Sequence, residues 1–203
     1  HDGILSLFGT WVSDTELGEG WFGADLGVST MYRYGYFEAS VKCSYIEKRG
    51  TGDFWSAFWI QATDPYTPEQ SQGGIGPGGM ELDIMENFGP DYTTCCFWSA
   101  GVEGREGLVN ELYQICDTGK NYHDEYHTYS LLWDEEAYSV FVDGVLIAHT
   151  DYYYGTARVP EEVRLTLCPR NSSNYEKDDT REMCVDYVRI WQKPDSEAVG
   201  SGS

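Results

Sequence analysis

The sequence predicts an all-β fold, and three observations support this prediction. Most readable segments alternate apolar and polar residues with the period of two that is typical of strands. Long stretches with the helical period of 3.6 residues are absent from the sequence. Asp143-Gly144 stands between two alternating segments, and this dipeptide favours the positive φ angles of a two-residue hairpin turn. Many strands joined by short turns predict a sandwich or a barrel.

The expected strands follow one another along most of the chain. From Gly35 to Cys43 every second residue is apolar, and from Phe54 to Ile60 the residues Trp55 and Trp59 share one face. Further strands are expected at residues 126–133, 138–142, 145–149, 163–168 and 184–192. The segment 64–79 is rich in Pro, Gly and Gln and is expected to be a loop at a functional rim.

Length and composition fit one globular domain. The chain has 203 residues, of which 41% are hydrophobic and 15% aromatic, enough for a packed core. We expect one folded unit over residues 1–193 and a flexible tail or linker over 194–203, which ends in Gly-Ser-Gly-Ser. Because the chain begins at His1 instead of Met, we also expect that an upstream leader was removed.

The formal net charge of −21 limits the choice of partners. Nucleic acid requires a basic surface, and a polyanionic polymer would be repelled at long range. No apolar run is long enough to span a membrane. Sixteen Tyr and seven Trp residues exceed the needs of a core and suggest surfaces on which rings stack. A neutral polymer is therefore the expected partner.

The six cysteines give no sign of a metal site. They show neither a CxxC pair nor a Cys/His spacing that would suggest zinc. Their even number permits disulfide bonds, and free thiols in the core are equally compatible with it.

The segment Glu81-Leu-Asp-Ile-Met-Glu86 carries the strongest chemical signal. On a strand Glu81 and Asp83 share one face, and a β-bulge around Met85 would return Glu86 to the same face. Two carboxyl groups about 5–5.5 Å apart suit a retaining glycosidase, in which one attacks the anomeric carbon and the other protonates the leaving oxygen. A third carboxyl between them can hold a proton and keep their pKa values apart. A solvated acidic strand or a calcium site would explain the same residues.

Several motifs, taken in order, resemble glycoside hydrolase family 16. They are Tyr34-Gly-Tyr-Phe-Glu-Ala-Ser-Val-Lys42, Trp55-Ser-Ala-Phe-Trp-Ile60, the carboxylate segment from Glu81, Tyr126-His-Thr-Tyr-Ser-Leu-Leu-Trp133, Val140-Phe-Val-Asp-Gly144 and Val185-Asp-Tyr-Val-Arg-Ile-Trp191. The resemblance implies a β-jelly roll of two curved antiparallel sheets with a concave glycan-binding cleft. It also implies that Glu81 is the nucleophile, Asp83 a helper and Glu86 the general acid/base.

The form of the motif bears on the substrate. The bulged Glu-x-Asp-x-x-Glu form resembles the laminarinase, agarase and carrageenase branch, whereas lichenases and xyloglucan enzymes use a shorter, regular strand. Two departures concern the substrate. Ser40 stands where the family often has Arg, and Thr94-Cys-Cys-Phe-Trp98 lacks the His that laminarinases commonly carry there.

Six further residues are expected to contact sugar: Trp55, Trp59, Trp98, His127, Glu38 and Tyr36. Trp55 and Trp59 share a face opposite Phe58 and Ile60, so the cleft is favoured over the core for them. Trp98 fits a subsite or the core equally well. By the resemblance His127 faces the cleft, where it would bond to sugar or Asp83, although neighbouring residues often satisfy a lone His. Asp186 resembles a residue that helps to bind a structural calcium in relatives, but calcium needs six to eight oxygen ligands.

These observations predict a retaining endo-β-glycosidase that hydrolyses a neutral β-linked polysaccharide, with β-1,3-glucan as the expected substrate. The alternatives are an endo-β-galactanase of the agarase type, a transglycosylase, and a carbohydrate-binding module without activity. The chemistry requires no cofactor, and a structural calcium is possible. We expect a monomer that is secreted or held at the cell surface, because its polymeric substrate lies outside the cell.

Overall fold

The computed structural model describes most of the chain. The described residues are 2–44, 54–62, 79–87, 92–102, 105–117, 120–152, 155–169, 176–177, 180–194 and 199–200. The expected loop at 64–79 therefore lies outside the described residues, apart from Gly79.

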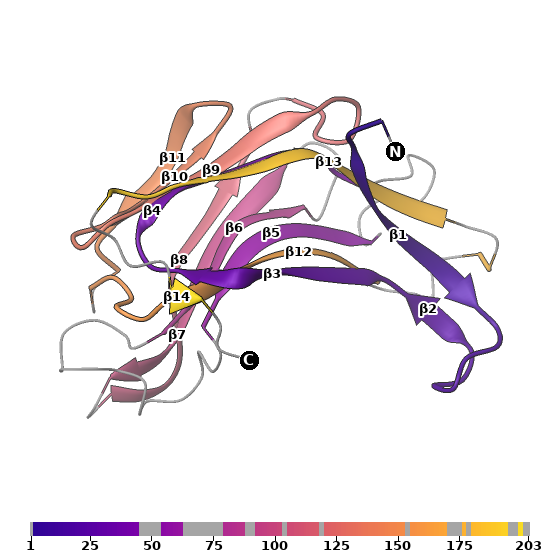
Figure 1. Ribbon diagram of the computed structural model, residues 1–203, viewed down its shortest axis with the longest axis horizontal. Helices are drawn as coiled ribbons and strands as arrows, with labels where there is room; N and C mark the ends of the chain where they lie inside the picture. Colours follow the sequence, from indigo (N-terminus) through magenta and orange to yellow (C-terminus); the bar gives the residue numbers. More distant parts are fainter. Residues whose placement is uncertain are drawn as a thin grey trace.

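The described residues form two antiparallel sheets that lie face to face (Figure 1). In spatial order, sheet A contains β11 (Val145–Thr150), β10 (Tyr138–Val142), β9 (His127–Trp133), β4 (Gly35–Lys42), β13 (Thr180–Trp191), β1 (Leu5–Val12) and β2 (Gly20–Phe22). Sheet B contains β14 (Val199–Gly200), β3 (Ala24–Tyr32), β12 (Glu161–Cys168), β5 (Trp55–Gln61), β6 (Glu81–Asn87), β7 (Thr93–Val102) and β8 (Arg105–Cys116). The predicted all-β sandwich is confirmed, and the described residues include no helix that could cross a bilayer.

The core lies between the sheets and is built by the alternation that the sequence shows. Phe37 on β4 and Leu131 on β9 face it from sheet A, and Phe58 on β5 and Leu82 on β6 face it from sheet B, all with no exposed surface. Burying one such side chain contributes about 1.5–3 kcal/mol. The alternate residues of the same strands must then point away from the core, to the outer face of each sheet.

The hairpin between β10 and β11 has the geometry that its sequence predicts. Asp143 has φ of 49° and Gly144 has φ of 76°, so both central residues adopt the left-handed conformation. The Asp143 carboxylate accepts a hydrogen bond from the Thr128 amide, 3.0 Å away, and this bond ties the turn to β9.

Two expectations about the rest of the chain can be compared with the structure. All six cysteines are free thiols, so no disulfide joins the sheets. Within the segment 194–203, expected to be a flexible tail, Val199–Gly200 forms β14 and pairs with Met31 and Thr30 at the edge of sheet B.

Candidate active site

The three carboxylates of β6 reach one face because the strand contains a bulge. Asp83 pairs with Cys96 and Glu86 with Thr94, so that Ile84 and Met85 together oppose the single residue Cys95. A second register shift lies on the other side of β6, where it pairs with β5. Ile84 and Met85 are both buried in the core, 1% and 0% exposed. The extra residue thus returns Glu86 to the outer face of sheet B.

This face carries a pocket of about 230 Å³ at the centre of sheet B, here called the cleft. Its lining comes from β3, β5, β6 and β12: Asp25, Trp55, Ala57, Trp59, Glu81, Asp83, Arg164, Thr166 and Cys168. Glu86 pairs with Ala57 of this lining and is 6% exposed. Apolar ring faces and carboxylates therefore share one depression.

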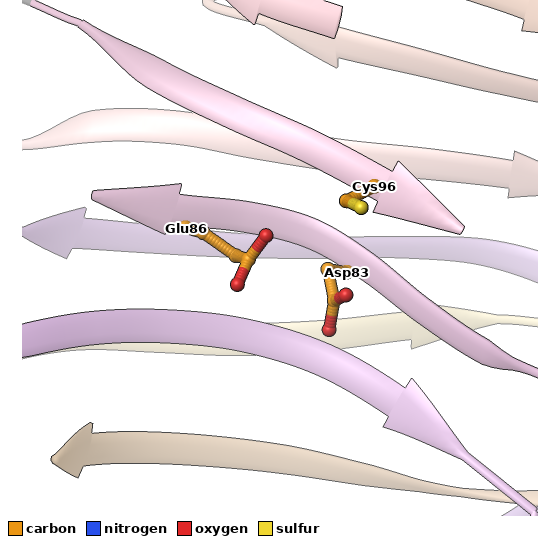
Figure 2. Close-up of side chains that lie close together, drawn as sticks. All are labelled: Asp83, Glu86 and Cys96. Carbon is orange, nitrogen blue, oxygen red and sulfur yellow. The ribbon is translucent and has the colours of Figure 1, made fainter. Parts of the chain in front are cut away.

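Asp83 and Glu86 lie side by side on β6, with Cys96 beside them on β7 (Figure 2). One ligand atom from each of the three residues lies within 4.8 Å of the others. Burial raises the pKa of Asp83 well above its ordinary range, and the neighbouring carboxylates of Glu86 and Glu81 raise it further. Asp83 therefore ionises less readily than an exposed aspartate does.

A polar network that the sequence did not reveal supports the cleft. The Gln61 side chain donates a hydrogen bond from Nε2 to Oε2 of Glu81, at 3.4 Å, and accepts one from Arg164 Nη1 on its own Oε1, at 3.3 Å. Arg164 also forms a two-pronged ion pair with Asp25 and lies 4.9 Å from the centre of the Trp59 ring. Gln61 and Arg164 thus fix Glu81 and Trp59 in place. Only the pairing of β12 with β3 and β5 brings these residues together.

The predicted tryptophans occupy the cleft face. Trp55 and Trp59 line the cleft, and the Trp59 indole donates a hydrogen bond to Thr166 Oγ1 at 3.2 Å. Trp98 pairs with Glu81 across β6 and β7 and is partly exposed, so it lies on the same face beside the carboxylates. Three rings therefore flank the acidic residues and add large apolar surfaces beside them.

Tyr36 and Glu38, which were expected to contact sugar, are not part of the cleft lining. Both residues lie on β4, in the sheet opposite the cleft, and Phe37 between them faces the core. Their side chains point outward from sheet A, where the Glu38 carboxylate accepts a hydrogen bond from the Tyr36 hydroxyl at 3.2 Å.

His127, which was expected to bond to sugar or Asp83, also lies outside the cleft lining and has other partners. His127 is 3% exposed at the start of β9 in sheet A. Its Nδ1 lies 2.8 Å from Asp143 Oδ2, and its Nε2 lies 3.2 Å from the Asn121 carbonyl oxygen. Both ring nitrogens therefore serve the β10–β11 hairpin and the segment before β9.

The structure gives little support to a metal at Asp186. This carboxylate is exposed on β13, and among the described residues the one group of three carboxylate, His or Cys ligands is Asp83, Glu86 and Cys96. A single carboxylate falls short of the six to eight oxygens that calcium takes, so the calcium site stays a prediction.

Comparison with known proteins identifies the family. The model of the family described as "Glycosyl hydrolases family 16" matches residues 14–189. The chain belongs to glycoside hydrolase family 16. The match contains all three carboxylates of β6 and every residue that lines the cleft.

Two relatives have names that describe the cleavage of β-linked glycans. The chain is 25% identical to an endo-1,3-1,4-beta-glycanase of Rhizobium meliloti (strain 1021) over 162 residues. This alignment covers 78% of this chain and 30% of the relative. It is 26% identical over 171 residues to a beta-glucanase of Brevibacillus brevis, covering 83% of this chain and 56% of the relative. The chain thus spans roughly a third to just over half of these relatives.

A solved structure shares the fold of the whole domain. A kappa-carrageenase of Zobellia galactanivorans superposes with a TM-score of 0.76 at 19% identity, over 95% of this chain and 80% of that chain. At this identity the likeness concerns the fold, a jelly roll of two antiparallel sheets.

Proposed function

We propose that the chain is a retaining endo-β-glycosidase that hydrolyses a neutral β-linked polysaccharide, with β-1,3-glucan as its substrate. One observation carries the proposal. The bulge in β6 brings Glu86 to the face of Glu81 and Asp83, which line a cleft together with the rings of Trp55 and Trp59. Stacking rings hold the polymer, and paired carboxyl groups break a glycosidic bond.

In the first half of the reaction Glu81 attacks the anomeric carbon. The Glu81 carboxylate forms a covalent bond to this carbon while the bond to the leaving oxygen breaks, and Glu86 gives its proton to that oxygen. Gln61 donates its hydrogen bond to Glu81 and orients the attacking carboxylate. The raised pKa of Asp83 favours its protonated form, in which it adds a donor without adding charge.

In the second half water replaces the enzyme on the sugar. Glu86, now a carboxylate, takes a proton from the water molecule, whose oxygen bonds to the anomeric carbon and releases Glu81. The resting protonation states of both glutamates are restored. Every step uses side chains of this chain, so the mechanism needs no cofactor.

The choice of a neutral glucan depends on charge and on the relatives. Among the described residues that line the cleft, the one cation is Arg164, which is already paired with Asp25, and the chain as a whole carries a charge of −21. A sulfated polymer would thus meet repulsion and no unpaired cation from the described lining. The relative from Brevibacillus brevis is named a beta-glucanase, which favours a glucan over a galactan.

The test is the release of reducing ends from laminarin, lichenan, agarose and a β-galactan, with Glu81→Gln and Glu16→Gln measured in parallel. Glu16 is exposed and distant in sequence from β6, so its variant controls for the loss of a carboxylate. We expect activity on laminarin that Glu81→Gln lowers by more than about 100-fold and Glu16→Gln leaves unchanged.

Other results would change the assignment. Activity on agarose or galactan alone would keep the mechanism and replace the substrate, and products longer than the starting oligosaccharide would indicate a transglycosylase. More than about one-hundredth of the activity remaining in Glu81→Gln would refute the role given to Glu81. Binding without cleavage by the unmodified chain would indicate a carbohydrate-binding module.

A further inference from the structure

A second and larger pocket lies on the outer face of sheet A, on the opposite side of the sandwich from the cleft. Its volume is about 550 Å³, within the range of sites that bind small organic ligands. Its lining comes from the start of β4, the end of β9 and the end of β13, and we call it the outer pocket: Arg33, Tyr34, Gly35, Tyr36, Leu132, Trp133, Asp134, Glu135, Trp191, Gln192 and Lys193. None of these residues serves the catalytic carboxylates.

The surface of the outer pocket is aromatic and apolar. Trp191 is 48% exposed and Leu132 is 38% exposed, although both are large apolar side chains. The register places Tyr36 between them, and the Tyr36 and Trp191 rings lie 5.6 Å apart with 49° between their planes. Two tilted rings beside an aliphatic side chain offer stacking surfaces to a ligand that has apolar faces.

The backbone beside the rings is held in an uncommon conformation. Tyr34 has φ of 61° and Gly35 has φ of 139°, and a Cβ atom on Gly35 would lie 2.6 Å from the Trp191 carbonyl oxygen. The Gln192 side chain donates hydrogen bonds to the carbonyl oxygens of Arg33 at 3.0 Å and of Tyr34 at 3.1 Å. Such strained positions occur often at ligand sites, where the surrounding structure fixes them. The pocket is thus built before a ligand arrives.

A polar centre lies next to the rings. The Glu38 carboxylate accepts hydrogen bonds from the hydroxyls of Tyr36 at 3.2 Å, Ser130 at 3.2 Å and Tyr187 at 3.0 Å. This array of hydroxyls fixes the tilt of the Tyr36 ring. Among the residues of the lining itself the formal charges balance: Arg33 and Lys193 against Asp134 and Glu135. In a chain with a net charge of −21 such a balanced site suits an uncharged ligand.

We propose that the outer pocket is a second glycan-binding site, which holds a segment of a neutral β-linked polysaccharide without cleaving it. A pyranose has an apolar face for the rings and hydroxyls for the charged rim, and the pocket accommodates a short run of sugar units. The site would keep the polymer attached while another segment lies in the cleft. This inference depends on the proposed function only for the choice of polymer.

The test measures retention on polysaccharide independently of cleavage. Affinity electrophoresis in gels that contain laminarin, lichenan, agarose or β-galactan is run on the Glu81→Gln chain, alone and combined with Trp191→Ala or Phe8→Ala. Phe8 is 51% exposed on β1 of the same sheet but outside the outer pocket, so it is the matched control. We expect Trp191→Ala to weaken retention on at least one polymer about ten-fold and Phe8→Ala to change nothing.

Two further measurements separate the explanations. With Glu81 intact, Trp191→Ala should leave kcat/KM on a short soluble oligosaccharide within about two-fold, because the outer pocket is remote from the carboxylates. If Trp191→Ala does not fold, Leu132→Glu puts a charge on the pocket surface and should have the same effect on retention. Light scattering in the absence of glycan should show a monomer for all variants.

The results distinguish this inference from the proposed function. Equal retention of the Trp191→Ala and Phe8→Ala chains on all four polymers overturns the outer pocket. If the unmodified chain is a dimer that Trp191→Ala dissociates, and retention is unchanged, the outer pocket is a contact between two copies and not a glycan-binding site. Retention that depends on Trp191 in a chain that cleaves none of the polymers supports the outer pocket and refutes the glycosidase.

Discussion

At the scale of single residues, the fold strongly alters the ionisation of Asp83. It is 6% exposed, and Glu81 and Glu86 share its face of β6. Burial and these two neighbouring carboxyl groups raise its pKa, because ionisation of Asp83 would place a further negative charge in a site with little water. The protonated form of Asp83, which this shift favours, is a potential hydrogen-bond donor.

This state of Asp83 predicts an order among its variants. Asn has nearly the shape of a protonated Asp and keeps a hydrogen-bond donor, whereas Ala removes the donor. We expect Asp83→Asn to retain roughly 10-fold to 100-fold more activity than Asp83→Ala, as the loss of a hydrogen bond to a charged group would suggest. Initial rates on laminarin would check this order, and equal activities would contradict the hydrogen-bonding role.

Glu161 illustrates the cost of a buried carboxyl outside the site. It has no exposed surface, its Oε1 accepts a hydrogen bond from the Met80 amide at 2.8 Å, and burial raises its pKa well above the ordinary value. Since its pKa in the folded state exceeds that in the unfolded chain, its contribution to stability is complete at low pH and is lost as pH rises toward the raised pKa.

Glu161→Gln should therefore make stability less dependent on pH. The amide oxygen can still accept the Met80 bond, and the side chain can no longer ionise. Urea unfolding at about pH 5 and about pH 8 should show that the variant gains free energy of unfolding relative to the parent as pH rises. If the free energies of unfolding of the variant and the parent differ by the same amount at both pH values, the role given to Glu161 is wrong.

At the scale of elements, the bulge in β6 decides which face Glu86 reaches. Deleting Ile84 leaves Glu-Leu-Asp-Met-Glu, a regular strand whose alternation still puts all three carboxylates on the cleft face. Inserting one Ala after Met85 instead would turn Glu86 toward the core. We expect the deletion to keep at least about ten-fold more activity than the insertion, although the lost core side chain costs about 2–5 kcal/mol of stability.

The comparison requires that both chains fold. Thermal unfolding monitored by circular dichroism identifies the temperature at which each is native, and activity is then compared at that temperature. Equal activity of the two folded variants would mean that the face reached by Glu86 is unimportant for the reaction.

The strands themselves were predictable from the sequence, because alternation and the Asp143-Gly144 turn are local signals. The bulge was predictable too, since three carboxylates could not otherwise share a face with Leu82 and Ile84 in the core. Alternation separates inward from outward residues but does not reveal the sheet to which a strand belongs. For this reason alternation did not show that Tyr36 lies in the sheet opposite the cleft. His127 was placed at the cleft by the resemblance, and the structure puts it in sheet A.

The network of Gln61, Arg164 and Asp25 could not be predicted from the sequence, for a related reason. Its members come from β5, β12 and β3, and each is an ordinary polar residue on its own strand. Only pairing between distant segments makes them neighbours of Glu81 and Trp59. No local pattern distinguishes such residues from solvated ones.

At the scale of the whole molecule, the net charge of −21 acts against compactness. Salt screens repulsion between surface carboxylates, with a screening length of about 10 Å at 0.1 M. We expect the melting temperature to rise when NaCl is raised from about 0.02 M to about 0.5 M at neutral pH. The rise should shrink near pH 4.3, the isoelectric point, where many carboxylates are neutral, and a rise of the same size at both pH values would point to a different cause.

The free thiols in the two sheets are natural reporters of how the sandwich opens. Cys43, just after β4, lies 3.9 Å from the Met85 sulfur, and Cys95 lies on β7 of sheet B; they are 3% and 2% exposed. Burial raises the pKa of both thiols to about 12, so neither offers a reactive thiolate near neutral pH while the protein is closed. The rate at which each thiol is alkylated, measured by mass spectrometry, would then report separately on the opening around Cys43 and around Cys95. Equal alkylation rates of Cys43 and Cys95 would mean that the two sheets open together. Faster modification of Cys95 would mean that sheet B, which carries the cleft, opens locally while sheet A stays closed.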